Sequence, residues 1–105
     1  MKTSVIVQFD LNENKLDDLF SFEESLTQGL LQSKKGAVDG NDIGSEKYNI
    51  YIFPSGSYGP CVTTVIMWLK AKDLASNAVI AHTTKSGNII VDFPKNHGEA
   101  FTYGI

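Results

Sequence analysis

Hydrophobic and polar positions alternate near the start of the chain, over residues 3–11. Val5, Val7 and Phe9 fall on one side of an extended backbone, and Ser4 and Gln8 fall on the other. A period of two is typical of a β-strand with one buried face. We therefore predict the first strand here.

A helical pattern follows, with two candidate starts. Asn14 precedes Asp17 by three residues, and Ser21 precedes Glu24 by three residues, which matches a capping box. In one continuous helix, Glu23 falls within the apolar arc formed by Leu16, Leu19, Phe20, Leu26 and Leu30. We therefore predict that the helix restarts at Ser21, with Glu23 near the positive end of the helix dipole. The buried stripe is then expected to consist of Leu26, Leu30 and Leu31, and the helix to stop near Ser33.

The remaining patterns predict a second helix and more strands. Residues 47–54 are rich in aromatic and β-branched side chains, and residues 37–46 are expected to supply a short hairpin partner. Pro60 is expected at the first position of a helix over residues 60–74, and residues 78–84 and 88–93 form a hairpin around residues 85–87. The predicted fold is a single α+β domain over residues 1–105. It is a two-layer ferredoxin-like (split βαβ) sandwich, with two helices on one face of an antiparallel sheet and an extra C-terminal strand.

The composition narrows the classes of function. The chain has 105 residues, 42% of them hydrophobic, and a single cysteine, so one core without disulfides or a bound metal is expected. The start of the chain has no signal-peptide pattern and no apolar run reaches membrane-spanning length, which predicts a cytoplasmic protein with no membrane partner. All nine basic residues are lysine, and the absence of arginine disfavours nucleic-acid binding.

Charge is distributed unevenly along the chain. Residues 1–46 contain nine acids and four lysines, whereas residues 47–105 contain three acids and five lysines. A local negative field favours a basic partner, although acids that merely complement helix dipoles on a solvated face are the alternative interpretation. The candidate partner-binding residues are seven acids and three aromatic anchors: Asp17, Asp18, Glu23, Glu24, Asp39, Asp42, Glu46, Tyr48, Tyr51 and Tyr58.

No pattern in the chain predicts catalysis or a cofactor. Cys61 lies in the predicted first turn of a helix, where its thiol is either a nucleophile or a small packing residue, and neither His82 nor His97 is paired with it in sequence. Residues 39–44 alternate acids, amides and glycines but lack the length and closing glutamate of a calcium loop, so we predict a turn there. We therefore expect a protein that is not an enzyme and binds neither metal nor cofactor.

The segment formed by residues 38–53 resembles a pattern in small bacterial α/β proteins, in which an acidic Asp-Gly-Asn-Asp-Ile-Gly turn leads into an apolar strand. The layout is similar to that of immunity proteins that accompany bacterial toxins, including those of contact-dependent growth inhibition. The resemblance implies a cytoplasmic protein that covers the active site of a cognate toxin, expected to be a basic nuclease domain. Such a protein is expected to be a monomer alone or a weak homodimer. The alternative is a homodimeric ferredoxin-like domain that binds a small ligand or regulates a metabolic partner.

Overall fold

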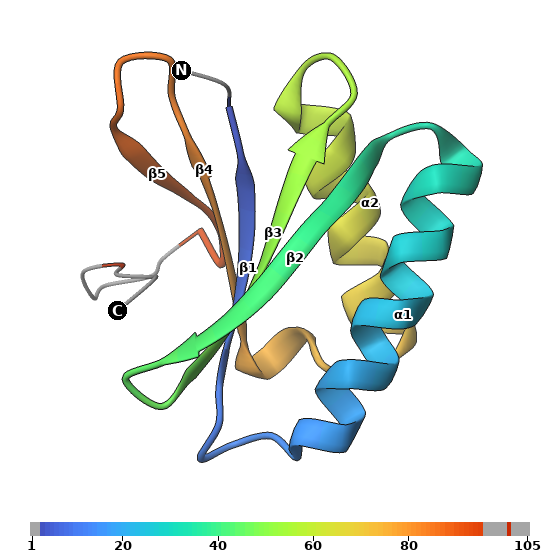
Figure 1. Ribbon diagram of the computed structural model, residues 1–105, viewed down its shortest axis with the longest axis vertical. Coiled ribbons are helices and arrows are strands. Elements are labelled where there is room, and N and C mark those ends of the chain that lie inside the picture. Colours follow the sequence, from blue (N-terminus) through green and yellow to red (C-terminus); the bar gives the residue numbers. More distant parts are fainter. Residues whose placement is uncertain (1–2, 96–100, 102–105) are drawn as a thin grey trace.

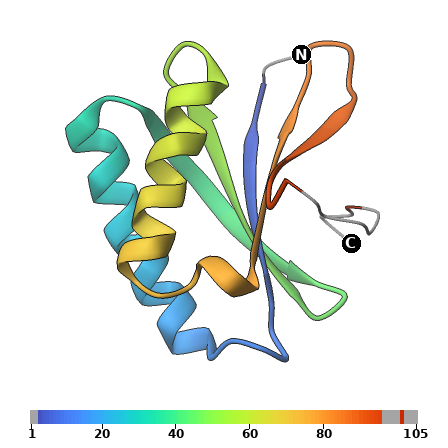
Figure 2. The ribbon, with the colours of Figure 1, turned by 180° about the vertical axis from the view of Figure 1, so that it is seen from behind.

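The computed structural model describes residues 3–95 and residue 101. Its elements are β1 (Val5–Asp10), α1 (Leu16–Ser33), β2 (Gly36–Gly44), β3 (Lys47–Pro54), α2 (Tyr58–Ala71), a short 3-10 helix (Ala75–Asn77), β4 (Ala78–Thr83) and β5 (Ile89–Phe93). The strands form one five-stranded sheet in the order β2-β3-β1-β4-β5, and every neighbouring pair is antiparallel. Both helices cover the same face of this sheet (Figures 1 and 2). The prediction of an α+β fold with an antiparallel sheet and two helices is confirmed.

The core lies between the sheet and the two helices. Alternate residues of the two central strands point into it, including Val7 and Phe9 of β1 and Ile50 of β3. Leu26 of α1 and Val65 of α2 meet them from the helical layer, and all five side chains are fully buried. Burying apolar side chains of this size contributes about 1.5–3 kcal/mol each. The period-two pattern predicted for residues 3–11 therefore marks the strand at the centre of the fold.

Helix α1 is continuous, so the predicted restart at Ser21 is wrong. The residue before the first turn is Lys15, which makes no side-chain cap, and the Asn14 amide instead donates to the Asp10 carbonyl oxygen at 2.9 Å. Glu23 is tolerated in mid-helix because its carboxylate accepts hydrogen bonds from residues of the sheet. The buried stripe also differs from the prediction, because Leu31 is 59% exposed and Phe22 and Gly29 are buried in its place.

Helix α2 begins two residues before the predicted start and ends three residues before the predicted end. Pro60 is its third residue, a position where the missing N–H still has no partner within the helix. At the other end, Asp73 adopts a left-handed conformation with φ of 59°, and the Leu74 N–H donates to the Leu69 carbonyl at 2.9 Å. This bond closes the helix, so Leu74 packs against the core from outside it.

The turn between β2 and β3 contains two strained residues. Ser45 and Glu46 have φ values of 52° and 62°, and Gly44 and Lys47 pair across the end of the hairpin. Positive φ at both central residues is the pattern of a type I′ turn, which favours asparagine and glycine. A side chain with a Cβ atom pays about 1–2 kcal/mol in this region of φ and ψ.

Replacing Glu46 with glycine should therefore raise the free energy of unfolding by about 1 kcal/mol, because the Cβ penalty disappears. Urea denaturation measures the change. Glu46→Ala is the matched control, since it also removes the exposed carboxylate but keeps the Cβ atom. Equal stability of the glycine and alanine variants would show that backbone strain at Glu46 is not the cause.

Candidate protein-binding surface

Six of the twelve acidic residues lie on two elements at one side of the molecule. Helix α1 contains four carboxylates and no lysine, and β2 contains two carboxylates and no lysine. The two elements pack side by side, as both views of the ribbon show (Figures 1 and 2). Residues 58–95, which contain α2, β4 and β5, carry four lysines and two acids. The charge asymmetry of the sequence is therefore also an asymmetry in space.

Tyr48 of β3 is buried between the sheet and α1 and links the two through Glu23. Its ring is fully buried, and its hydroxyl donates to the Glu23 carboxylate at 2.5 Å. The Asn41 amide on β2 donates to both oxygens of the same carboxylate, at 2.9 and 3.0 Å. Burial and the neighbouring Glu23 raise the pKa of Tyr48 far above its ordinary value. Tyr48 is thus a structural support, and its predicted role as an exposed aromatic anchor does not fit its position.

Two exposed apolar side chains flank this buried ring. Phe20 is 47% exposed and contacts the Tyr48 ring edge-on, with centroids 5.7 Å apart. Ile43 is 54% exposed and pairs with Tyr48 across the β2–β3 ladder. Phe20, Glu23, Asn41 and Ile43, around the buried Tyr48, are called the α1–β2 surface below. It combines exposed apolar groups with a carboxylate that two hydrogen-bond donors hold in place.

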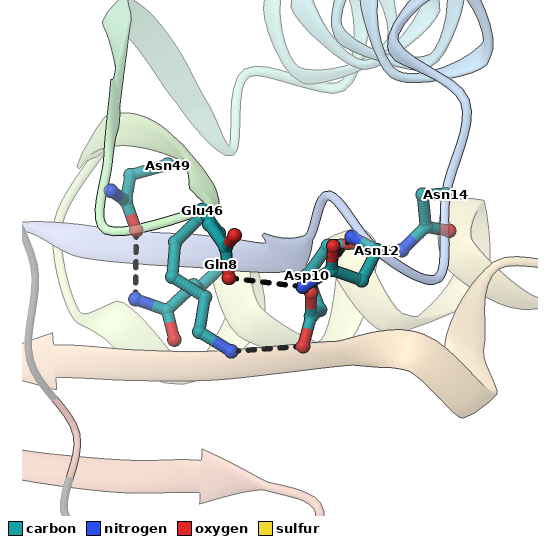
Figure 3. A network of polar contacts seen from close by, with 7 residues as sticks. Gln8, Asp10, Asn12, Asn14, Glu46 and Asn49 are labelled. Carbon is teal, nitrogen blue, oxygen red and sulfur yellow. Dashed lines mark hydrogen bonds and ion pairs between the residues drawn. The ribbon is translucent and has the colours of Figure 1, made fainter.

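Asp42 lies on the opposite face of β2 and is also held in place. Its carboxylate accepts from the Asn49 amide at 2.8 Å and from the Tyr51 hydroxyl at 2.7 Å. The Asn49 amide oxygen in turn accepts from the Gln8 amide at 2.9 Å, the bond drawn in Figure 3. A polar chain from Asp42 through Asn49 to Gln8 therefore links β2, β3 and β1. Asp42 and Tyr51 therefore belong to one network, away from the face that the helices cover.

The tip of the β2–β3 hairpin is tied to the loop after β1 (Figure 3). Glu46 accepts from the Asn12 amide at 3.2 Å, and Lys47 forms an ion pair with Asp10 at 3.2 Å. The backbone N–H of Asn12 and the Lys47 ammonium together lower the pKa of Asp10. Glu46 is thus held at the hairpin tip by a neutral amide, on a different part of the molecule from the acids of α1.

Four predicted site residues are exposed and have no hydrogen-bond or ion-pair partner within the described part of the chain: Asp17, Asp18, Glu24 and Asp39. Three of them belong to α1 and one to β2. Residues 39–44 form part of β2, which confirms the predicted hairpin partner of residues 47–54, and the predicted turn within this segment is wrong. Among the described residues, no group of three or more histidine, cysteine, aspartate or glutamate side chains is placed to hold a metal ion.

Tyr58, the tenth predicted site residue, lies away from the α1–β2 surface. Its ring stacks on His82, with centroids 3.7 Å apart, and His82 Nδ1 lies 2.7 Å from the Asp92 carboxylate. The pairing of His82 with Asp92 was missed from the sequence, and only the register of the β4–β5 hairpin brings the two residues together. A carboxylate on Nδ1 orients an imidazole, but no serine, threonine or cysteine among the described residues hydrogen-bonds this ring. His97 lies outside the described residues.

Cys61 is fully buried in α2, and burial raises the pKa of its thiol from 9.0 to about 11. At mildly alkaline pH the thiolate population therefore falls about 100-fold below that of a normal cysteine. We expect native protein to react with a thiol reagent at least about 100-fold more slowly than protein in denaturant. Rapid labelling of the native protein would show that Cys61 is reactive after all.

A polar pocket of about 350 Å³ lies between the start of α1 and the end of α2. Its lining consists of Asp18, Ser21, Phe22, Lys72, Asp73 and Leu74. The lysine and the two carboxylates carry opposite charges, a combination that suits a small zwitterionic ligand better than a purely basic one.

In the described part of the chain, neither helix is long and apolar enough to cross a membrane.

Comparison with known proteins gives no relative from which to transfer a function. No family model, no curated protein and no solved structure matches the chain. The resemblance of residues 38–53 to toxin-immunity proteins therefore remains a prediction, and the proposed function rests on the chemistry of the α1–β2 surface.

Proposed function

We propose that this protein is a non-enzymatic binding protein that captures a basic protein on the acidic side formed by α1 and β2. The proposed partner is a cognate bacterial toxin, a basic nuclease domain whose active site is covered in the complex. The observation that carries the proposal is the placement of six carboxylates and no lysine on these two adjacent elements, which also carry the exposed Phe20 and Ile43.

The arrangement suits an inhibitor of a protein that binds nucleic acid. Carboxylates presented on one side attract a basic active site over a distance and increase the rate of association. Glu23 and Asp42 are already fixed by hydrogen bonds, so fewer side chains lose freedom when a complex forms. Phe20 and Ile43 supply exposed apolar area on these two elements, of the kind that a partner can desolvate.

We also propose that the sheet and the two helices have a ferredoxin-like, split βαβ topology. Helix α1 connects β1 to β2 with β3 lying between these strands, and α2 connects β3 to β4 with β1 lying between them. Two such interleaved units support a ferredoxin-like, split βαβ arrangement with β5 added at one edge. The α1–β2 surface then arises from the first unit alone.

The test is co-expression with the polypeptide encoded next to this protein, followed by affinity capture at low and high salt. We expect one basic protein to be retained at low salt, and its affinity to fall at least about tenfold at high salt. The nuclease activity of the captured protein should disappear in the complex. Failure to retain a basic protein under any salt condition would contradict the proposal.

A pair of charge-reversal variants locates the interface. Glu24→Lys places a cation on the exposed acidic side of α1, and Asp73→Lys makes the same charge change at an exposed residue two positions after the end of α2, outside the α1–β2 surface. We expect Glu24→Lys to weaken the complex at least about tenfold more than Asp73→Lys. Equal effects of the two substitutions would mean that net charge, and not this surface, governs binding.

A second candidate function, binding of a small ligand by a homodimer, is favoured by the pocket at Asp18, Lys72 and Asp73. In that case sedimentation should show a dimer that is insensitive to salt. Small zwitterions such as free amino acids should also raise the melting temperature of the protein but not that of the Lys72→Ala variant. A monomer with an unchanged melting temperature would remove this candidate.

A further inference from the structure

The outer edge of β2 is open within the described part of the chain. This strand is terminal in the sheet order, and β3 is the strand that pairs with it. With nine residues it is also the longest strand described. Edge strands are usually protected by charged side chains, above all lysine, by proline, by bulges or by a covering element, because their free N–H and C=O groups pair readily with other chains. Here β2 contains neither lysine nor proline, and a bulge between Val38 and Gly40 is its one irregularity.

The two faces of β2 differ in chemistry. On the face toward the helices, Asn41 and Ile43 alternate, opposite Ile50 and Tyr48 of β3. On the other face, Gly40, Asp42 and Gly44 alternate, so a fixed carboxylate stands between two residues without side chains. A strand added at this edge would meet an apolar and aromatic surface on one side and a negative charge with open space beside it on the other.

The charge of β2 opposes a second copy of this chain as the occupant. Antiparallel pairing of two β2 edges would bring the acids Asp39 and Asp42 of each copy close together, with no lysine in either strand to compensate them. Like charges facing each other across a strand pair are destabilising. The same acids attract a basic strand, so charge complementarity selects a different polypeptide.

We infer that β2 accepts an extended segment of the basic partner as a sixth strand of the sheet. The segment alternates lysine or arginine with apolar residues. Its basic side chains lie on the face of Asp42, and its apolar side chains lie on the face of Ile43 and Phe20. Backbone hydrogen bonds supply affinity in this mode of binding, and the alternating side chains supply specificity. The inference rests on the proposed function, because it states how the partner reaches the acidic side.

The experiment uses the full chain and three nine-residue peptides of identical net charge, whose termini are chemically blocked. The first alternates lysine and valine, the second carries the same residues in pairs, and the third is the alternating peptide N-methylated at its three central residues. Titration calorimetry gives the affinities, and deuterium exchange reports the protection of the β2 amides. We expect the alternating peptide to bind at least about tenfold more tightly than the other two, and to be the one that slows exchange in β2.

Two substitutions locate the site of docking. Asp39→Lys and Glu24→Lys change the charge equally at exposed positions of β2 and α1. Strand addition predicts that Asp39→Lys loses more peptide affinity than Glu24→Lys.

Equal, salt-sensitive binding of all three peptides would overturn strand addition but leave the acidic interface of the proposed function intact. Slowed exchange of β2 without peptide, together with a dimer in sedimentation, would identify a second copy as the occupant and overturn the inference. Absence of binding by every peptide would overturn it too, while retention of a basic protein in the co-expression test would still support the proposed function.

Discussion

Replacing Tyr48 with alanine is expected to lower the free energy of unfolding by about 3–5 kcal/mol, the range for truncating a buried aromatic side chain. The ring is fully buried between β3 and α1, so its removal leaves a cavity beneath Phe20. The Glu23 carboxylate also loses the hydroxyl that donates to it. Urea or thermal denaturation measures the loss, and a change below about 1 kcal/mol would show that Tyr48 does not hold α1 against the sheet.

Tyr48→Phe separates the hydroxyl from the ring. It keeps the packing but removes one donor from a partly buried carboxylate, so we expect a loss of about 1–3 kcal/mol. Asn41 still donates to Glu23, which limits the loss. If phenylalanine proved as destabilising as alanine, the hydroxyl and not the ring would be the main support. If it were neutral, the bond to Glu23 would contribute nothing to stability.

The raised pKa of Tyr48 also predicts that the free energy of unfolding depends on pH in the alkaline range. The pKa of Tyr48 is raised in the folded protein above its ordinary value of 10.0, first by burial and then by Glu23. The folded state therefore keeps the proton more firmly than the unfolded state, and the stability from this difference is present below pH 10 and declines as the pH rises above it. Tyr48→Phe should have a flatter stability profile above pH 10. An identical alkaline slope in both proteins would exclude Tyr48 as its source.

The parts of the fold that follow from local patterns were predictable. The alternation in residues 3–11 identified β1, and residues 85–87 were predicted as the turn between the last two strands, where Gly87 has φ of 91°. The alternation in β3 separates Tyr48, Ile50 and Ile52 from a set that contains Lys47 and Asn49, and the structure places the first set against the helices. Tyr48 was predicted as an aromatic anchor from its residue type alone, because the alternation within residues 47–54 was not used to assign a buried face.

The main differences between the predicted and the observed structure arise from contacts between residues that are distant in sequence. Glu23 looked incompatible with a continuous helix because Tyr48 and Asn41 are at least 18 residues away in sequence. Residues 39–44 looked like a turn because glycine, asparagine and aspartate are uncommon in strands, and pairing with the strongly predicted β3 overrides that preference. The acids of the candidate surface can be listed from the sequence, but a list of acids does not show which of them share a side. That information comes from the packing of α1 on β2.

Replacing Gly29 with alanine should destabilise the protein by about 2 kcal/mol, the opposite of its effect in an isolated helix. Alanine is favoured over glycine within helices by about 1 kcal/mol. At Gly29, however, an added Cβ atom would lie 2.5 Å from Nε1 of Trp68 and 2.6 Å from two carbons of the same ring. Relieving this overlap requires the indole or the whole of α1 to move, and overpacking of this kind costs about 1–3 kcal/mol.

The decisive control is the same substitution in a Trp68→Ala background. Removal of the indole removes the three closest contacts of the added Cβ atom, so Gly29→Ala should then stabilise the protein by up to about 1 kcal/mol through helix propensity. The sign of the effect thus depends on one contact, and a double-mutant cycle should give a coupling energy of about 2–3 kcal/mol. If Gly29→Ala has the same sign in both backgrounds, the close approach of α1 and α2 at this point does not set the position of α1. Because α1 carries four of the six carboxylates of the acidic side, that position also determines whether they face the same partner as β2.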